Sequence, residues 1–221
     1  MQCPASVRMS DEVPERASGA AAAAGTLMHT VFERLLLNQG HLNPNEIKEL
    51  SNLDFDENRA RLIIDQGVVA ARTALARYRL AEFVTEVRVD PGQRIGRSDF
   101  WGTADLIGAD PLHRILMVGD FKTGRGRVDV RNNTQLMCYA MGSLDLVNFT
   151  PERVILAILQ PPVWGSNPAV WETSISELRT FEKYVMGQAE LTDQFETPPT
   201  PSKEACLWCP AKVVCPVWLA R

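Results

Sequence analysis

Residues 114–122 form a nearly continuous apolar run, Arg114-Ile-Leu-Met-Val-Gly-Asp-Phe-Lys122, which ends in a carboxylate. Such a run predicts a central β-strand, because a strand covered on both faces loses the polar alternation of a surface strand. Burial of Asp120 at the end of this strand is costly unless a cation meets the carboxylate. Side chains alternate along a strand, so Asp120 and Lys122 are expected to project to the same side. The chain is therefore expected to contain a buried sheet with a charged pair at a strand end.

Elsewhere in the chain, the spacing of apolar residues alternates between the three- to four-residue period of a helix and the two-residue period of a strand. Periodicity predicts helices over residues 26–37, 57–80, 134–146 and 175–191. It predicts strands over 83–89, 101–107 and 153–160, with an edge strand over 170–173. The Ala- and Gly-rich residues 1–25 are expected to form a loop, a helical turn and a lead-in, and 197–202 a proline-rich linker. This order predicts an α/β sandwich with a small mixed sheet.

The composition is that of a globular protein with 45% hydrophobic and 23% charged residues. A length of 221 residues suits one large domain, or one domain with an appendage. No apolar run reaches the ~18–20 residues that span a bilayer, and no secretion leader is recognised, so a cytoplasmic location is expected by default. The net charge of −4 argues weakly against coating nucleic acid by bulk electrostatics, but it leaves room for a locally charged site.

The acidic residues of two neighbouring strands suggest a metal site. Asp105 follows Gly102-Thr-Ala on the strand before Asp120, and Mg²⁺ prefers carboxylate, carbonyl and water oxygens. Two carboxylates, the Phe121 carbonyl and the Lys122 ammonium are the groups that metal-assisted phosphodiester hydrolysis needs. The alternative is a surface ion pair between Asp120 and Lys122, which is the commoner meaning of Asp-x-Lys taken alone.

Three further segments add polar side chains at helical or loop positions. Gln135 and Tyr139 are four residues apart and share a helix face, as do His29 and Glu33. Neutral histidine is a common metal ligand, although a lone histidine on an amphipathic helix is more often structural. Glu86 is a weaker candidate. The segment between Leu112 and Gln135 contains five basic residues, among them Arg125 and Arg127, but only two acidic residues. This excess of positive charge suits either a phosphate-binding segment or a solvated loop.

Four motifs in this order resemble the RecB-like branch of the PD-(D/E)XK nucleases. They are Gly25-Thr-Leu-Met-His29-x3-Glu33, Gly102-Thr-Ala-Asp105, Asp120-Phe-Lys122-Thr and Gln135-x3-Tyr139. The resemblance implies a restriction-endonuclease-like αβ sandwich, whose small mixed sheet is flanked by helices. It implies that Mg²⁺ or Mn²⁺ binds to His29, Asp105, Asp120 and the Phe121 carbonyl, with Lys122 as the catalytic lysine. Supporting or DNA-contacting roles follow for Gln135, Tyr139, Glu33, Arg125 and Arg127. Asp120 stands where many members have glutamate, and the pattern permits both residues.

The five cysteines point to a second metal site. Cys206, Cys209 and Cys215 have the spacing C-x2-C-x5-C, and three thiolates in a short loop hold an iron–sulfur cluster or zinc with a fourth ligand. Cys3 is the natural fourth ligand, whereas Cys138 lies in an expected helix where a buried free cysteine is ordinary. An odd number of cysteines argues against a disulfide framework, and unpaired cysteines in a tail remain an alternative.

One cysteine before the core and three after it is similar to iron–sulfur nucleases that include the CRISPR-associated RecB-like nucleases and phage exonucleases. That resemblance implies a [4Fe–4S] cluster, with zinc as the alternative. The expected organisation is an N-terminal segment over residues 1–25 with the first cluster cysteine, a nuclease core over 26–196, and a linker with a cluster-binding tail over 197–221.

The function that the resemblance implies is a metal-dependent DNA exonuclease in recombination, repair or replication, in a form that would suit a phage. Its expected partner is DNA that is single-stranded or has free ends. The chain lacks a G-x4-G-K-[ST] motif, so unwinding would require a helicase or a single-strand annealing partner. The alternatives are an endonuclease, an inactive nucleic-acid-binding adaptor of the same fold, and an electron-transfer protein built on the cluster.

Overall fold

A computed structural model describes residues 3–14, 19–40, 43–53 and 56–220 of the chain. Parts of the expected N-terminal segment, 1–2 and 15–18, lie outside the described residues. The chain divides into two compact units. The larger unit spans Ser18–Arg179, and the smaller unit combines Met1–Ala17 with Thr180–Arg221. Each unit is described below by itself. Among the described residues, no helix combines the length and apolar character that crossing a membrane requires.

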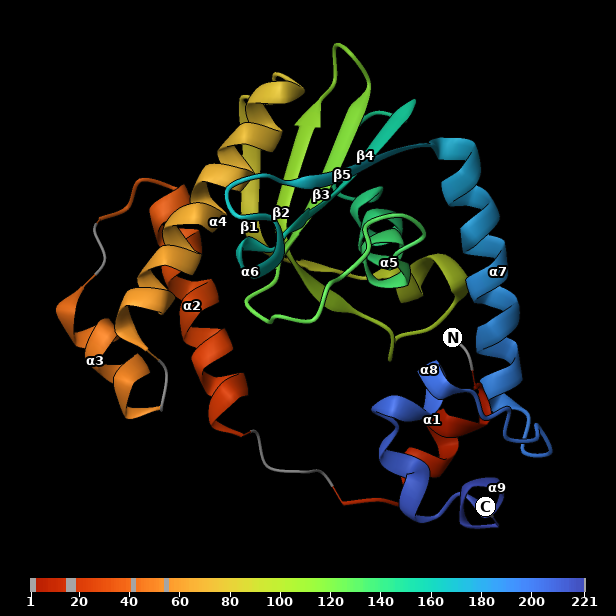
Figure 1. Cartoon of the computed structure of the whole chain (residues 1–221). Helices are drawn as coiled ribbons and strands as arrows, with labels where there is room; N and C mark the ends of the chain where they lie inside the picture. Colours follow the sequence, from red (N-terminus) through yellow and green to blue (C-terminus); the bar gives the residue numbers. More distant parts are fainter. Residues whose placement is uncertain (1–2, 15–18, 41–42, 54–55, 221) are drawn as a thin grey trace. The chain divides into compact units, whose positions relative to one another are not determined.

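A five-stranded mixed sheet forms the centre of the larger unit (Figure 1). The strands follow one another in sequence order, and only β3 and β4 are parallel. This arrangement confirms the predicted α/β class with a mixed sheet flanked by helices. All seven residues of β3 are buried, as its apolar sequence predicts for a central strand. The strands are β1 (Glu82–Val89), β2 (Gly102–Asp110), β3 (Ile115–Phe121), β4 (Arg153–Leu159) and β5 (Ala169–Ser174).

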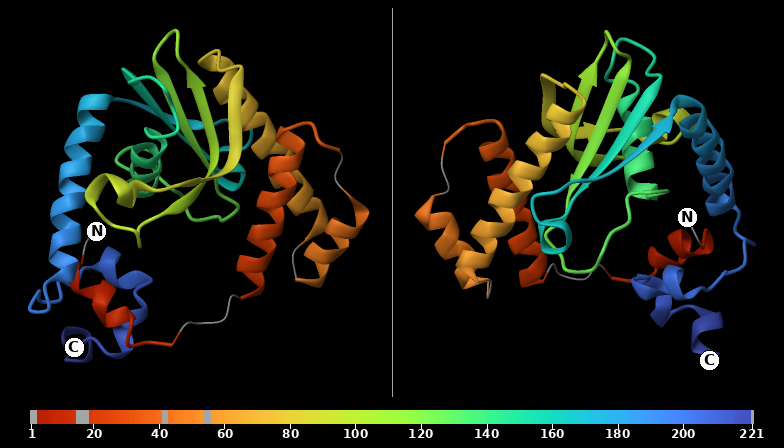
Figure 2. Two further views of the ribbon diagram at one scale, coloured as in Figure 1. Left: turned by 180° about the vertical axis from the view of Figure 1, so that it is seen from behind. Right: turned by 45° about the horizontal axis from the view of Figure 1, so that its top comes forward.

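Helices cover the two faces of this sheet (Figure 2). On one face α2 (Ala20–Leu36), α3 (Pro44–Asn52) and α4 (Glu57–Arg77) share a core with alternate residues of β3, which are Ile115, Met117 and Phe121. The intervening residues of β3 point to the opposite face, where α5 (Thr134–Ser143) contacts the strands. Two short helices, η1 (Pro91–Ile95) and α6 (Pro161–Trp164), complete the unit.

The main differences from the predicted elements lie at the N-terminal side. The lead-in expected before residue 26 was wrong for Ala20–Ala24, which form the first turns of α2. Alanine has the highest helix propensity, and this outweighed the loop-like composition of the segment. Helix α3 was not predicted, although Asn43 and Glu46 close a capping box around Pro44 at its start. The other predicted helices and strands lie within a few residues of their expected bounds, including the edge strand at β5. The short helices η1 and α6, and those of the cysteine tail, were not predicted.

The smaller unit is built from the two ends of the chain. Helix α7 (Ile175–Asp193) begins in the larger unit and continues into the smaller one. The other elements are α1 (Ala5–Ser10), α8 (Lys203–Leu207), η2 (Pro210–Val213) and α9 (Pro216–Leu219). Residues 197–202 form no helix or strand, as expected of a proline-rich linker. The buried core is small: among the described residues of this unit, Ala5, Met9 and Ala211 form it, with cysteines packed around them.

An ion pair fastens α3 to α2 and makes the stability of the larger unit depend on pH. Arg34 Nη2 donates to Glu46 Oε2 at 2.6 Å, and this bond holds the pKa of Glu46 below its usual value. A lowered folded pKa stabilises the fold at neutral pH, and this stability is lost as pH falls through that pKa. Replacing Glu46 by glutamine is therefore expected to lower the unfolding free energy by about 1 kcal/mol at pH 7 and by much less at pH 3. Urea unfolding at both pH values measures the difference.

The control for this prediction is Glu49, which is exposed on the same helix. Glu49→Gln should leave the unfolding free energy within about 0.5 kcal/mol of wild type at both pH values. An equal loss for Glu46→Gln at pH 7 and pH 3 would show that the ion pair contributes no pH-dependent stability.

Candidate metal centre and active site

The predicted acids lie where two central strands diverge. The ladder between β2 and β3 ends at the pair Leu106–Gly119, so Asp105 and Asp120 are the next residues beyond the last paired positions. Both side chains are buried, with 7% of Asp105 and 3% of Asp120 exposed. Asp105 Oδ2 accepts a hydrogen bond from the Phe121 backbone N–H at 2.6 Å, which ties the first acid to the strand that carries the second.

A histidine and two carboxylates gather at this point. His29 Nδ1, on α2, lies 3.2 Å from Asp105 Oδ1 and 3.8 Å from Glu86 Oε1 on β1. One ligand atom from each of the three side chains lies within 4.8 Å of the other two. We call these residues the His29–Glu86–Asp105 group. Two carboxylates and an imidazole are a donor set that suits divalent cations such as Mn²⁺, so the residues fit a metal ion.

Glu86 reaches this group through an unusual backbone conformation. Its φ angle is +49°, in the left-handed region, although it lies in the middle of β1. The ladder between β1 and β2 passes from Thr85–Leu106 to Val87–Ala104 and omits the pair Glu86–Asp105. A non-glycine residue in this region costs roughly 1–3 kcal/mol, and such residues cluster at functional sites. The distortion lies opposite Asp105, at the centre of the acidic group.

The charges in this region are strongly coupled. Burial lowers the pKa of His29, but the hydrogen bonds and charges of Asp105 and Glu86 raise it by more, to about 10. The metal-free imidazole is therefore protonated at neutral pH and acts as the counter-ion of the carboxylates. Burial raises the pKa of Asp120 to about 6, against the opposing charge of Lys122. A cation bound to His29 would displace the imidazole proton that otherwise balances the charge of Asp105 and Glu86.

Lys122 connects the acids to α5. Its Nζ lies 2.9 Å from Asp120 Oδ2 and donates to Gln135 Oε1 at 3.0 Å. The contact with Asp120 is an ion pair without hydrogen-bond geometry, and among the described residues Asp120 Oδ2 has no hydrogen-bond partner. Gln135 Nε2 in turn donates to Tyr139 Oη at 2.9 Å. The structure thus joins Asp120, Lys122, Gln135 and Tyr139, which the sequence placed on a strand and a helix, in one polar chain.

The remaining residues suggested by the sequence lie around this centre in different ways. Glu33 Oε1 accepts a hydrogen bond from Thr85 Oγ1 at 3.1 Å. Glu33 therefore contacts β1 at the residue before Glu86 and is not part of the His29–Glu86–Asp105 group. The Phe121 ring stacks on Phe32, with ring centroids 4.4 Å apart. It also packs so closely against Gly67 that a Cβ atom at this position would clash with the ring. This packing fixes the backbone of Phe121, whose carbonyl is one of the expected metal ligands.

A buried glutamine shapes the basic loop after Lys122. Only 1% of Gln160 is exposed, and its Nε2 donates to the carbonyls of Gly124 at 2.9 Å and Gly126 at 2.6 Å. Its Oε1 accepts from the Val128 N–H at 3.0 Å. The peptide groups before Arg125 and after Gly126 are thereby fixed, and the Arg125 side chain is exposed. Arg127, by contrast, pairs with Asp129 at 2.9 Å and lies over the Trp164 ring.

Two residues of this centre were missed or undervalued by sequence reasoning. Glu86 was only a weak candidate, because its place opposite Asp105 depends on strand register. Gln160 was not considered. It nevertheless carries the signal that identified Asp120, since it is a polar residue at the end of an apolar strand, and two prolines follow it.

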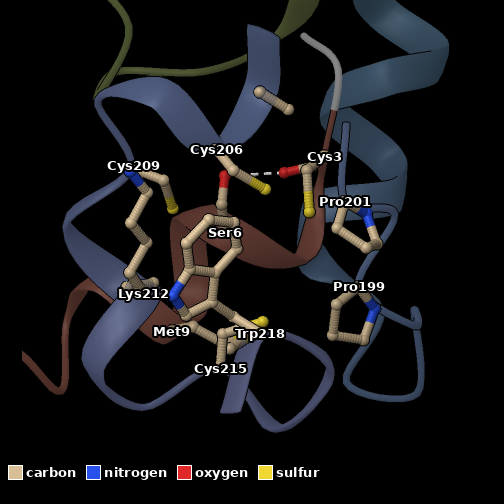
Figure 3. A pocket seen from close by; sticks show the side chains of 12 residues that line it. Cys3, Ser6, Met9, Pro199, Pro201, Cys206, Cys209, Lys212, Cys215 and Trp218 are labelled. Atoms are coloured by element: carbon tan, nitrogen blue, oxygen red, sulfur yellow. Dashed lines mark hydrogen bonds between the residues drawn. The ribbon is translucent and has the colours of Figure 1, made fainter. Parts of the chain in front are cut away.

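Four cysteines line one pocket in the smaller unit (Figure 3). Cys3, Cys206, Cys209 and Cys215 come from both chain ends, and their side chains turn toward a shared space. All are free thiols, and Cys3 Sγ accepts from the Thr200 N–H at 3.3 Å. Among the described residues, no three cysteine sulfurs lie within 4.8 Å of one another. Cys138 lies on α5 in the larger unit, where burial raises the pKa of its thiol to about 11.

The fold and the site define a mixed α/β protein with a candidate metal centre at the divergence of two strands. The chain belongs to the DUF2800 family, described as proteins of unknown function, whose model matches residues 1–219. A solved structure described as "Crystal structure of SSO0001" is similar at 18% identity and a TM-score of 0.39. The match covers 87% of this chain and 95% of that chain. This likeness is too distant to assign a fold family or an activity.

Proposed function

We propose that the protein is a metal-dependent DNA nuclease of the RecB-like PD-(D/E)XK type that hydrolyses phosphodiester bonds at DNA ends. The observation that supports this proposal most directly is the His29–Glu86–Asp105 group, together with the ion pair between the buried Asp120 and the half-buried Lys122. The four sequence motifs that resemble this branch supply all of these residues except Glu86. Buried carboxylates gathered next to one lysine suit the hydrolysis of an anionic phosphodiester.

The residues divide the chemistry between them. His29, Glu86 and Asp105 would hold Mg²⁺ or Mn²⁺. The resemblance adds Asp120 and the Phe121 carbonyl as further ligands, although Asp120 is not part of the His29–Glu86–Asp105 group. The metal supplies Lewis acidity and a water of lowered pKa. Lys122, held between Asp120 and Gln135, stabilises the negative charge that develops on the phosphate and positions the attacking water. Arg125, on the loop that Gln160 fixes, is the nearest basic side chain along the chain for a flanking phosphate.

The four cysteines that line one pocket would hold a [4Fe–4S] cluster, with a single zinc ion as the alternative. The support is that all four come together from both chain ends, in the order that the resemblance to iron–sulfur nucleases implies. We assign this cluster a structural role in the smaller unit.

Digestion of labelled DNA tests the function and the metal site together. We expect anaerobically purified protein to cleave linear DNA with Mn²⁺ or Mg²⁺ and to lose this activity with a chelator. Glu86→Gln should weaken Mn²⁺ binding about 10-fold or more, measured as a smaller rise in Tm on adding Mn²⁺. Glu82→Gln, a change to an exposed acid at the start of the same strand, is the matched control.

The outcome of this digestion separates three functions. Cleavage of linear DNA with intact closed circles supports an exonuclease, and cleavage of circles as well indicates an endonuclease. If protein with its cluster intact cleaves no DNA under any metal condition, the enzyme proposal is wrong. DNA binding without cleavage would then favour the inactive adaptor.

A further inference from the structure

Trp101, the residue directly before β2, is exposed, in contrast to the usual burial of this residue type. Just over half of its surface, 55%, is accessible, whereas tryptophan usually buries most of its area. The guanidinium of Arg88, on the paired strand β1, lies 4.5 Å from the centroid of the indole ring. Arg88 is in turn held by Asp90, with Nη2 and Oδ1 2.9 Å apart. We call this pair the Trp101–Arg88 platform.

The platform is close in sequence to the two carboxylates of the His29–Glu86–Asp105 group, which lie on β1 and β2. Arg88 follows Glu86 by two residues on β1, and Trp101 precedes Asp105 by four residues. At about 3.3 Å per strand residue, the platform lies roughly 7–13 Å along the hairpin from the carboxylates. A second link runs through Gly102, where a Cβ atom would meet the Tyr139 ring at 2.6 Å. Tyr139 belongs to the polar chain that contains Lys122.

The surroundings of Trp101 favour a nucleobase as its occupant over a protein. Between residues 85 and 111, all of them described, Trp101 is the only exposed large hydrophobic residue. Protein-binding hot spots are usually ringed by further contacts that exclude water. In this segment Trp101 has the charged Arg88 and Asp90 beside it and no second exposed large hydrophobic residue. Nucleobases, by contrast, stack on single aromatic side chains, and arginine contributes to such sites.

We propose that the Trp101–Arg88 platform binds a nucleobase of single-stranded DNA, about two to four nucleotides from the phosphate at the acidic group. This inference rests on the proposed nuclease function. The spacing follows because stacked bases rise about 3.4 Å per nucleotide along a strand. Both faces of a base inside a duplex are covered by its neighbours, so stacking on Trp101 requires a single strand or a frayed end. The platform therefore selects single-stranded substrate and sets its register in the site.

Kinetics of single-stranded oligonucleotide digestion test the platform. Trp101→Ala should raise KM by about 5- to 100-fold with little change in kcat, which is the effect expected of one stacked base. Trp101→Phe keeps an aromatic face and should recover most of the loss. Leu112→Ala is the control, because Leu112 is 84% exposed beyond the other end of β2. An unchanged KM in Trp101→Ala would overturn the inference even though the nuclease is active.

An abasic scan of the oligonucleotide locates the subsite. With the wild type, removing the base at one position two to four nucleotides from the cut should raise KM as Trp101→Ala does. The same abasic substrate should cost Trp101→Ala nothing further, because the stacking partner is already absent. Equal abasic penalties in wild type and variant would overturn the inference and leave a protein contact as the use of Trp101.

Failure of the nuclease proposal would be distinguishable from failure of this inference. If the wild type cleaves nothing, fluorescence anisotropy of a labelled single strand still compares wild type with Trp101→Ala. Weaker binding by the variant alone would support the platform in a protein that binds DNA without cleaving it. Equal binding would overturn the platform as well.

Discussion

Replacing Lys122 by alanine is expected to lower kcat for hydrolysis of linear DNA by about 10²- to 10⁴-fold, with a small change in KM. The Lys122 ammonium lies 2.9 Å from Asp120 Oδ2 and 3.0 Å from Gln135 Oε1, so its position is fixed before substrate arrives. A pre-positioned cation stabilises charge that develops in the transition state without the cost of reorganisation. Single-turnover cleavage of end-labelled DNA with Mn²⁺ measures the loss.

The same substitution should leave metal binding largely intact, which separates chemistry from assembly of the site. Lys122 is not part of the His29–Glu86–Asp105 group, so Mn²⁺ should still raise the Tm of Lys122→Ala. The Tm without metal is needed as a control, because removing one partner of a buried ion pair destabilises a protein. Lys48→Ala, a change to an exposed lysine of α3, should behave as wild type. Wild-type cleavage by Lys122→Ala would reduce the Asp120–Lys122 pair to a structural ion pair.

Much of the fold could be predicted because its signals are local. The apolar run of β3 specified a buried strand, and the alternation of side chains placed Asp120 and Lys122 on one side. The proline-rich residues 197–202 likewise excluded regular structure by chain chemistry alone. The start of α2 was missed because an alanine- and glycine-rich composition suits both loops and helices, and the high helix propensity of alanine decided between them. Only Ala24 of the segment Ala20–Ala24 is buried.

The part of the site that sequence could not give depends on long-range geometry. The place of Glu86 opposite Asp105 is set by the register between β1 and β2, which no local pattern specifies. Its left-handed backbone has no signature in a glutamate, because glycine or asparagine is the usual residue there. The three hydrogen bonds of Gln160 join residues more than 30 positions apart in the chain. A polar residue at the end of an apolar strand indicated a position of interest, but the residues that it contacts could not be predicted from the sequence.

Loss of the cysteine-bound group should unfold the smaller unit and leave the larger unit folded. In the part of the smaller unit that the structure describes, the buried apolar core consists of Ala5, Met9 and Ala211, whereas the larger unit has an extensive core between sheet and helices. Small units with so little apolar burial usually require a covalent or metal staple. A link between Cys3 and Cys206 closes a loop of about 200 residues and restricts the unfolded chain by roughly 5 kcal/mol on the entropy model used for disulfides.

Cys206→Ala is therefore expected to abolish iron binding and to make the chain ends protease-sensitive. Anaerobically purified wild type should contain about four iron atoms and matching acid-labile sulfide per chain, as a [4Fe–4S] cluster requires. Limited proteolysis with mass spectrometry should show cleavage of the variant within residues 1–17 and 180–221, with a resistant fragment close to Ser18–Arg179. The wild type should resist cleavage in the parts of these segments that the structure describes, residues 3–14 and 180–220.

Cys138→Ala provides the matched control, because Cys138 lies on α5 in the larger unit, and burial raises its thiol pKa to about 11. A cysteine held in this neutral form is unsuited to metal ligation, which requires the thiolate. This variant should keep the iron content and the protease resistance of wild type. If the wild-type chain contains one zinc ion and no iron, the four cysteines form a zinc site and not an iron–sulfur site. If Cys206→Ala contains as much iron as the wild type, Cys206 is excluded as a ligand of the cluster. If its chain ends also resist proteolysis without bound iron, the smaller unit is stable by packing alone.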